Sequence, residues 1–226
     1  MDERFERNIG AITALEQESL FSKKAVIIGC GGLGCHSAEL LARIGIGHLT
    51  LIDGDVFAAS NMNRQLNSMK KNLGKNKAAE AKKRLAGIRS DLSVKAVKTF
   101  LNTGNARKLL KSHDLIIDAL DNVRARLLIE ETANKLGIPI IHGAVEGWCA
   151  QVCTVFPGDF TLSMLYREKH EFDKPSVLSF APAFCASIQA SEAVKVLLGR
   201  TNILRKKLFT ASLRDNTFNI IELCSE

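Results

Sequence analysis

The sequence predicts an α/β fold: a Rossmann-like, doubly wound, mostly parallel sheet that is extended by antiparallel strands and preceded by an N-terminal helical arm. Three observations predict it. Short apolar runs alternate with helical patterns from residue 24 to about residue 142, as in consecutive βαβ units. A glycine-rich turn follows the first of these runs. After residue 148 the residues alternate between apolar and polar and end in a hairpin pattern, which is typical of antiparallel strands.

The individual elements follow from the same patterns. Five apolar runs, AVIIG, HLTLID, SVKAV, DLIIDAL and IPIIHG, predict the parallel strands, and helical patterns fall between them at 75–88, 105–112 and 122–137. The helix at 122–137 is expected to end at Gly137, because a glycine C-cap followed closely by proline stops a helix. The remaining strands are predicted at 149–156, 206–215 and 217–224, with a helix at 182–199.

Length and composition favour one domain. At 226 residues and 46% apolar composition, the chain has room for a substantial core. We expect a single domain, 1–226, with an arm at 1–22, a first half at 23–147 and a second half at 148–226 that contains a polar crossover loop at 157–179. No apolar run approaches the length of a membrane span, and residues 1–10 are charged where a secretory signal is apolar, so the sequence predicts a cytoplasmic protein.

Cysteines and charge limit the classes of ligand. The six cysteines form no C-x-x-C pair and lie in apolar or glycine-rich segments, so we expect reduced thiols and no zinc. The net charge of +7 is concentrated at 70–84 and 198–207, which favours an acidic partner or a polyphosphate. Nucleic acid is the weaker interpretation, because lysines at helical spacing more often form a solvated face.

The glycine turn predicts a nucleotide. Gly29, Gly31 and Gly34 fit the spacing G-x-G-x-x-G, which brings backbone amides and a helix N-terminus close to a phosphate. Asp53 closes the next apolar run, where an acidic residue binds ribose in such folds. A tight turn without any ligand is the alternative, because the glycine spacing alone is a weak signal.

A second polar cluster follows Asp53 in the sequence DGDVFAASNMNRQL. Because it follows a strand end of a parallel sheet, it is expected to face the ligand crevice. Lys77 begins a later helix, and Asp121 and Asn122 follow the fourth strand. Two cations, Arg64 and Lys77, and a further carboxylate are therefore expected to converge on one ligand.

With these segments in place, the chain resembles the ThiF/MoeB/HesA adenylyltransferases, the bacterial relatives of the ubiquitin-activating enzymes. The matching pieces are RFER, GCGGLG, LIDGDVFAASNMNRQ, GKNKAAEA, DALDN, HGAVEGWCAQVCTVFPGD and SIQASEAVKVLLG, which span nearly the whole chain in family order. The resemblance implies ATP with Mg²⁺ rather than NAD, and adenylation of the C-terminal glycine carboxylate of a small ubiquitin-fold sulfur carrier with release of pyrophosphate. It also implies a carrier that ends in two glycines, a homodimer and a separate protein that donates sulfur. On this resemblance, 23–147 is the nucleotide-binding half and 148–226 is the carrier-binding half.

The resemblance further implies the roles of single residues. Two cations grip the polyphosphate, one carboxylate holds the ribose, a second carboxylate engages Mg²⁺, and the glycine turn lies against the phosphates. The cations are Arg64 and Lys77, supported by Gln65, and the carboxylate that holds the ribose is Asp53. The carboxylate that engages Mg²⁺ is Asp121, together with Asn122. The glycines are Gly29, Gly31, Gly32 and Gly34, and the nucleotide pocket is lined by Asp55, Ser60 and Asn61. Arg7 resembles an arginine that this family supplies to the site of the neighbouring subunit.

The chain departs from many relatives in its cysteines. Of the two C-x-x-C pairs that bind zinc in those relatives, the first is absent and the second is reduced to Cys224, so zinc is not expected. The segment 167–179 contains no cysteine that would take the activated carrier as a thioester, and Cys185 lies on an apolar helical face where a buried thiol is expected. We therefore expect adenylation only.

Two residues near the fifth strand stay open. His142 either touches the substrate or, as is more common for a histidine at a strand end, is a hydrogen-bonded structural residue. Trp148 either packs under the sheet edge or lines the channel for the tail of the carrier. Other functions are weighed as well: an NAD-dependent oxidoreductase on the same scaffold, a non-catalytic binding subunit, and adenylation of a small molecule or a modified tRNA base. The N-x-N-R-Q segment counts against NAD, the retained charges count against a non-catalytic subunit, and 142–159 favours a carrier protein. No nucleic acid or membrane partner is expected, and the choice between thiamine and molybdopterin pathways stays open.

Overall fold

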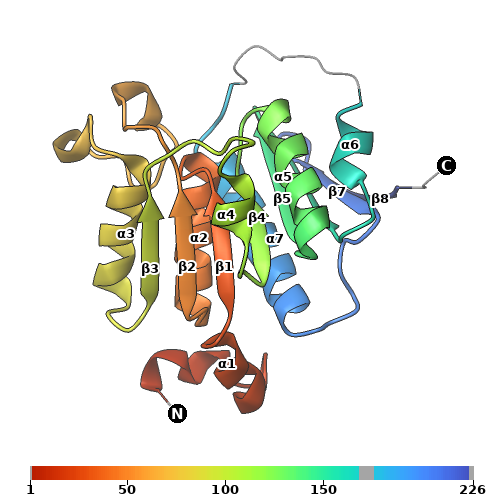
Figure 1. Cartoon of the computed structure of the whole chain (residues 1–226), viewed down its shortest axis with the longest axis horizontal. Helices are drawn as coiled ribbons and strands as arrows, with labels where there is room; N and C mark the ends of the chain where they lie inside the picture. Colours follow the sequence, from red (N-terminus) through yellow and green to blue (C-terminus); the bar gives the residue numbers. More distant parts are fainter. Residues whose placement is uncertain (1, 168–175, 224–226) are drawn as a thin grey trace.

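The computed structural model describes residues 2–167 and 176–223, and one eight-stranded sheet runs through them in the order β3-β2-β1-β4-β5-β6-β7-β8 (Figure 1). Strands β1 to β5 are parallel, and β6 to β8 continue the sheet as antiparallel neighbours. The strands are Lys24–Ile28 (β1), His48–Ile52 (β2), Ser93–Val97 (β3), Leu115–Asp118 (β4), Ile140–Glu146 (β5), Cys149–Val155 (β6), Lys207–Ser212 (β7) and Thr217–Glu222 (β8).

Helices cover both faces of this sheet. Side chains alternate between the faces of a strand, and in β1 Ala25 and Ile27 join one apolar core whereas Val26 and Ile28 join the other. The first core contains residues of α2, α3 and α7, and the second contains residues of α4, α5 and α6. The predicted doubly wound fold, with its antiparallel extension, is confirmed. The helices are Gly32–Ile44 (α2), Lys77–Ile88 (α3), Phe180–Leu197 (α7), Ala106–Leu110 (α4), Val123–Leu136 (α5) and Thr161–Leu165 (α6).

The order in which strands are added to the sheet changes direction between β1 and β4. Strands β2 and β3 lie on one side of β1, and β4 and β5 lie on the other, so a ligand crevice is expected above this switch point. Gly29 follows β1 there with φ of +92°, and a Cβ at this position would lie 2.5 Å from the carbonyl oxygen of Ala119. A Cβ on Gly34 would lie 1.8 Å from the carbonyl oxygen of Gly29. Glycine at these positions therefore lets α2 pack directly over the turn.

The N-terminal arm lies beyond the amino ends of the parallel strands, at the opposite end of the sheet from the crevice (Figure 1). It consists of the 3₁₀ helix η1 (Glu3–Asn8) and α1 (Ala14–Leu20). Phe5 is 2% exposed and packs against Phe21, with the ring centroids 5.1 Å apart, and the guanidinium of Arg89 lies 5.1 Å from the centroid of the Phe5 ring. The contact with Arg89 thus fixes the arm to the body of the same chain.

Two segments differ from the prediction. Two short 3₁₀ helices, η2 (Ala59–Asn61) and η3 (Lys70–Asn72), shape the segment after β2. The polar crossover predicted at 157–179 contains the short helix α6, because the buried carboxylate of Glu130 in α5 accepts hydrogen bonds from the backbone amides of Leu162 (2.6 Å) and Ser163 (2.8 Å). Part of that crossover, 168–175, lies outside the described residues.

The helix predicted at 182–199 begins two residues earlier, at Phe180. Pro182 occupies its first turn, where the missing N–H breaks no helical hydrogen bond. Among the described residues, none of the helices combines the length and the apolar character that crossing a bilayer requires. The single-domain organisation and its boundaries stay a prediction.

Candidate active site

The glycine turn and the segment after β2 meet at the carboxyl edge of the sheet. Helix α2 begins at its N-cap Gly31 with no side-chain cap from the described chain and no acidic residue in its first turn, so its first amide groups suit an anion. A Cβ on Gly31 would lie 3.4 Å from Gln65 Nε2, and one on Gly32 would lie 3.4 Å from the carbonyl oxygen of Arg64. The structure therefore brings the two predicted motifs into contact.

Asp53 lies directly beside the glycine turn. Its Oδ2 accepts a hydrogen bond from the backbone amide of Cys30 (2.7 Å), and its Oδ1 accepts one from that of Asp55 (2.8 Å). Burial raises the pKa of Asp53 above its ordinary value, although these two amides and the charge of Lys77 act in the opposite direction. An oriented carboxylate at this position is chemically suited to accept hydrogen bonds from ribose hydroxyls.

Lys77 is held at the start of α3. Its side chain is 8% exposed, and its ammonium group forms an ion pair with the carboxylate of Asp55. Asn76 caps α3 by accepting a hydrogen bond from Ala79 N (3.1 Å), and it donates to the carbonyl oxygens of Asp53 (2.9 Å) and Asp55 (3.0 Å). Asn76 is therefore a residue that the sequence reasoning missed. An asparagine directly before a predicted helix is an N-cap signal that would have found it.

Arg64 projects from the same segment. Its Nη1 donates to the carbonyl oxygen of Ser60 (3.0 Å) and to Asn63 Oδ1 (2.8 Å). Asn61 turns the chain, because its Oδ1 accepts a hydrogen bond from Ala58 N (2.9 Å). Ser60 and Asn61 thus shape the loop that carries Arg64, and their predicted contact with a nucleotide stays a prediction.

Gln65 gives the strongest local sign of a ligand. It is 7% exposed, and its Oε1 has no hydrogen-bond partner among the described residues. Buried polar atoms in native structures almost always have a partner, and this one belongs to the side chain that lies next to Gly31. An unpaired acceptor beside an uncapped helix N-terminus fits a bound polar molecule that presents both a donor and an anion, as ATP does.

Asp121 and Asn122 follow β4 on the other side of the switch point. Asp121 is exposed, and Ala119, two residues earlier, contacts Gly29 at the end of β1. Asn122 is the N-cap of α5, and its Oδ1 accepts a hydrogen bond from Ala125 N (2.9 Å). The carboxylate of Asp121 therefore suits Mg²⁺ as a hard oxygen ligand, whereas the carbonyl group of Asn122 is already used by its own helix.

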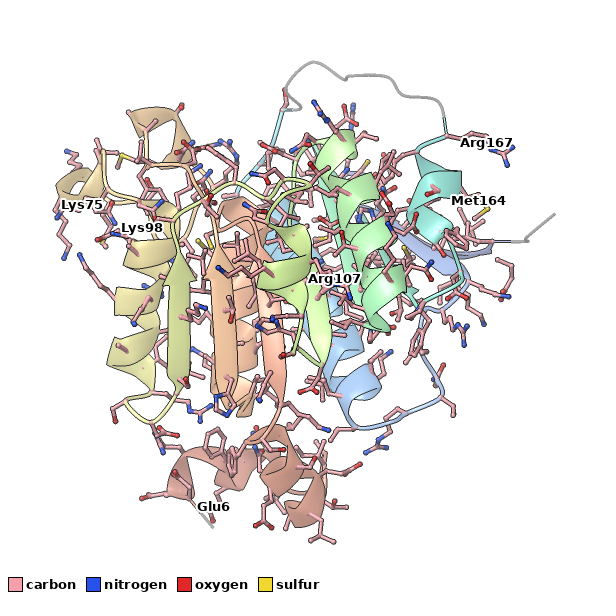
Figure 2. The ribbon with its side chains drawn as sticks, viewed as in Figure 1. Glu6, Lys75, Lys98, Arg107, Met164 and Arg167 are labelled. Carbon is pink, nitrogen blue, oxygen red and sulfur yellow. The ribbon has the colours of Figure 1, made fainter. Side chains whose placement is uncertain are left out.

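Arg7 lies far from this edge within its own chain. It belongs to η1, whose last residue, Asn8, donates to Gln17 Oε1 (2.8 Å) and to the carbonyl oxygen of Ile44 (3.5 Å). Ile44 ends α2 and precedes the amino end of β2, so η1 lies at that end of the sheet. Figure 2 shows the neighbouring Glu6 at the opposite end of the molecule from Lys75 and Lys98, which lie near the carboxyl edge. Arg7 can reach a site of this kind only on a second copy of the chain.

A buried pair, Asp118 and His142, lies behind the site. Asp118 is the last residue of β4 and His142 lies in β5, both fully buried, and Asp118 Oδ2 accepts a hydrogen bond from His142 Nδ1 (2.7 Å). Burial lowers the pKa of His142, although the carboxylate of Asp118 acts in the opposite direction, and the net shift favours the neutral imidazole. The expectation that His142 is a hydrogen-bonded structural residue is confirmed. The sequence reasoning considered only the second aspartate of DALD and missed Asp118.

Cys185 and Trp148 lie in different environments. Cys185 is fully buried, as expected, and burial raises the pKa of its thiol to about 12, which makes it a poor nucleophile. Trp148 is 44% exposed and packs against Phe180 with the ring centroids 4.9 Å apart, so both interpretations of it stay open.

Within 2–167 and 176–223, no group of three or more His, Cys, Asp and Glu side chains is arranged to hold a metal. Cys224 lies outside the described residues, and the zinc prediction stays untested.

The comparisons with known proteins agree with this geometry. Residues 5–226 match the ThiF family. The "SAMP-activating enzyme E1" of Haloferax volcanii is 31% identical over 91% of this chain and 78% of its own length. The vegetative HesA protein of Trichormus variabilis is 33% identical over 89% and 77%, and the "Sulfur carrier protein ThiS adenylyltransferase" of Bacillus subtilis is 35% identical over 81% and 56%.

Solved structures show the same fold. The crystal structure of PaaA has a TM-score of 0.81 and 25% identity, covering 98% of this chain and 82% of that one. The structure of E. coli MccB with ATP has a TM-score of 0.85 and 22% identity, covering 99% and 72%. At this identity the similarity to MccB supports the fold alone.

Proposed function

Because the chain belongs to the ThiF family, we propose that it is an adenylyltransferase that uses ATP and Mg²⁺ to activate the C-terminal glycine carboxylate of a small ubiquitin-fold sulfur carrier. Relatives named for adenylation of a sulfur carrier or for molybdopterin synthase support this proposal. One structural observation carries it: Asp53, Lys77, the backbone of Arg64 and the side chain of Gln65 lie around the glycine turn. Among the described residues, neither Gln65 Oε1 nor the N-terminus of α2 has a side-chain partner. The carrier is of the ThiS or MoaD type, and it serves sulfur transfer to thiamine or to molybdopterin.

The chemistry requires charge neutralisation rather than a general base. A carboxylate titrates near 4 and is already ionised at neutral pH. An oxygen of the carrier's carboxylate forms a bond to the α-phosphorus of ATP. The bond between that phosphorus and the oxygen bridging the α- and β-phosphates breaks, and pyrophosphate leaves. Two anions must approach each other in this step, so preorganised cations lower the barrier. Arg64 and Lys77 supply two of these charges at the carboxyl edge of the sheet.

The remaining residues bind and orient the nucleotide. The amides of the glycine turn and of the first turn of α2 face the phosphates, and Asp53 accepts hydrogen bonds from the ribose hydroxyls. Mg²⁺ would be held by Asp121 and would reduce the negative charge on the phosphates. Arg7 acts on the site of a second copy in a homodimer, since η1, which carries Arg7, lies beyond the amino ends of the strands in its own chain. Sulfur is delivered to the adenylate by a separate protein, because the segment 167–179 contains no cysteine that could take the carrier and Cys185 is buried.

The test is ATP–pyrophosphate exchange with candidate carriers that end in two glycines, followed by intact mass for the added adenylyl group. Arg64→Ala should depress the exchange rate about 10²- to 10³-fold, as expected for loss of one preorganised charge stabiliser. Arg7→Ala should also be impaired, and mixing it with Arg64→Ala should restore part of the activity, because mixed dimers contain one intact site. Arg107→Ala, an exposed arginine on α4, is the control and should exchange normally.

Other results would contradict the proposal. Binding of NAD in preference to ATP would identify an oxidoreductase on this scaffold. Exchange that needs a small carboxylate or an RNA base instead of any carrier would place the chain among adenylating enzymes with non-protein substrates. Full activity of Arg64→Ala would remove Arg64 from the reaction. Failure of the two variants to complement each other would remove Arg7 from the partner's site.

A further inference from the structure

Four side chains behind Asp121 form a continuous hydrogen-bonded path. Arg126 of α5 donates from Nη1 to the hydroxyl oxygen of Tyr166 (2.9 Å), which ends α6. The Tyr166 hydroxyl lies 3.1 Å from His142 Nε2, and His142 Nδ1 lies 2.7 Å from Asp118 Oδ2. The path thus links α5, α6, β5 and β4. Its partners are 40, 24 and 24 positions apart along the chain.

Chemistry fixes the direction of every hydrogen bond in this path. The carboxylate of Asp118 only accepts, so the neutral form of His142 carries its proton on Nδ1 and its Nε2 is an acceptor. Tyr166 must then donate its single proton to Nε2, and its oxygen accepts from Arg126 and from Gln151 Nε2 (3.0 Å). Each proton has one place, which makes such a network rigid.

The path closes on the peptide group of Leu120. Its amide donates to Asp118 Oδ1 (3.0 Å), and its carbonyl oxygen accepts from Arg126 Nη2 (2.6 Å). Both polar backbone atoms of Leu120 are therefore fixed by the two ends of the path. The next residue is Asp121, which is exposed.

Arg126 is placed to serve the protein rather than a ligand. Its side chain is 10% exposed, and its guanidinium carbon lies 5.1 Å from the centroid of the Tyr166 ring. Arg126 Nε lies 3.7 Å from Asp118 Oδ2, an ion pair that is too long for a hydrogen bond. Since Nη1 and Nη2 are used by Tyr166 and Leu120, this arginine is held inside the structure.

We propose that Arg126, held by the Tyr166 hydroxyl, is a positioning residue that fixes the peptide before Asp121 and thereby places the Asp121 carboxylate for Mg²⁺ and ATP. This inference rests on the proposed function. It goes beyond a structural ion pair, because it predicts that loss of Arg126 acts through Asp121. Groups around a metal ligand typically change metal affinity or activity about 10- to 100-fold when they are removed.

The first test replaces Arg126 by lysine. Lysine keeps the charge but lacks the planar fork, so it cannot bond Tyr166 and Leu120 together. In Arg126→Lys, the Mg²⁺ concentration for half-maximal pyrophosphate exchange should rise about 10-fold, while the KM for the carrier stays within twofold. The control is Arg107→Lys on α4, which should leave both values unchanged. In an Asp121→Asn background, adding Arg126→Lys should change the exchange rate less than twofold, because the group that it positions is already lost.

The second test does not depend on activity. Hydrogen exchange of the Leu120 amide, measured on the chain without ATP, should accelerate at least about 10-fold in Arg126→Lys while the global unfolding midpoint changes little. Tyr166→Phe removes only the hydroxyl and keeps the ring over the guanidinium, so it should shift both readouts in the same direction by a smaller factor. It also keeps the proposal testable if Arg126→Lys does not fold.

The outcomes separate the two proposals. A wild-type chain that shows no exchange activity, but whose Leu120 amide depends on Arg126, overturns the proposed function. An active enzyme in which Arg126→Lys and Tyr166→Phe leave the Mg²⁺ dependence or the Leu120 amide unchanged overturns the positioning role. A full effect of Arg126→Lys in the Asp121→Asn background also overturns it, since Arg126 would then act by another route.

Discussion

The carboxyl ends of β2 and β4 each place an aspartate at the same edge of the sheet, but the two ends are built in different ways. Asp53, after β2, is only partly buried and is held by the backbone amides of Cys30 and Asp55. Asp118, at the end of β4, is fully buried and is bonded to His142 and to the amide of Leu120. The β2 end leaves polar atoms for a ligand, whereas the β4 end uses its polar atoms to hold the next residue.

The electrostatics show the same difference. Burial raises the pKa of Asp53, so its charged form is unfavourable in the folded chain, and Gln65 nearby has a buried oxygen without a partner among the described residues. Around Asp118, the imidazole, the guanidinium of Arg126 and the amide of Leu120 all face the carboxylate. Functional sites commonly keep such local conflicts, and the surrounding structure compensates for them.

The largest effect is expected from exchanging the two aspartates for alanine. Asp118→Ala leaves a buried imidazole N–H and an amide without their acceptor and leaves Arg126 without its ion-pair partner, so it should lower the free energy of unfolding by about 3–5 kcal/mol. Asp53→Ala removes a carboxylate whose burial is itself unfavourable, so it should lower stability by less than about 1.5 kcal/mol while still impairing ATP use. Urea unfolding of both variants, with exchange assays on the folded proteins, measures the difference.

A third aspartate provides the control for this comparison. Asp114 also accepts a backbone hydrogen bond, from Lys24 N (2.8 Å), but this contact is exposed and lies at the amino end of β4. Asp114→Ala should therefore shift the urea midpoint only slightly. Equal shifts for Asp118→Ala and Asp53→Ala would show that the two strand ends do not differ in the way described.

The sequence predicted the β2 end better than the β4 end, because local patterns describe the first and distant partners make the second. The glycine turn and Asp53 follow strand ends and Lys77 begins a helix, so periodicity and turn residues were enough to predict that they lie at the same end of the sheet. The network of Asp118 depends on His142, 24 positions later, and on Tyr166, a further 24 positions later. No short pattern reports such spacing.

Helix α6 was missed for a related physical reason. A five-residue helix has little stability of its own, and Phe160 before it provides no side-chain cap. Its first amides are bonded instead by Glu130, which lies on another helix 32 positions earlier. In contrast, the long helix Val123–Leu136 ends at Gly137 in a left-handed conformation with φ of 72°, as the sequence predicted.

A smaller effect is expected from pH. The pKa of His142 is lowered from its ordinary value of 6.5, mainly by burial, while Asp118, Arg126, Glu130 and Tyr166 surround it. The unfolded chain binds this proton more readily, so the stability that the neutral ring contributes is present above pH 6.5 and is lost as pH falls toward the lowered pKa. His142→Asn should flatten the decline of the unfolding free energy below pH 6.5. His48→Asn, at an exposed histidine, should not.

At the β2 end the sign is reversed. The pKa of Asp53 is raised from 3.8 by burial, so its contribution to stability is fully present below pH 3.8 and is lost as pH rises through the raised value. Asp53→Asn should therefore gain stability relative to the wild type as pH increases from about 4 toward neutrality. Parallel pH dependence of His142→Asn and Asp53→Asn would contradict the comparison.

The smallest effect is expected at Asn63, on the loosely held side. Its Oδ1 accepts from Arg64 Nη1 (2.8 Å), its Nδ2 donates to the carbonyl oxygen of Val177 (3.1 Å), and both contacts are exposed. Asn63→Ala should lower the exchange rate about 2- to 5-fold, which corresponds to one exposed hydrogen bond that orients Arg64. Asn63→Asp keeps the acceptor for Arg64 and loses the donor to Val177, so near-normal activity of this variant would assign the effect to Arg64. A loosely held arginine should tolerate the loss of one neighbour. If Asn63→Ala lowers the exchange rate as much as Arg64→Ala does, the β2 end is therefore as tightly constrained as the β4 end.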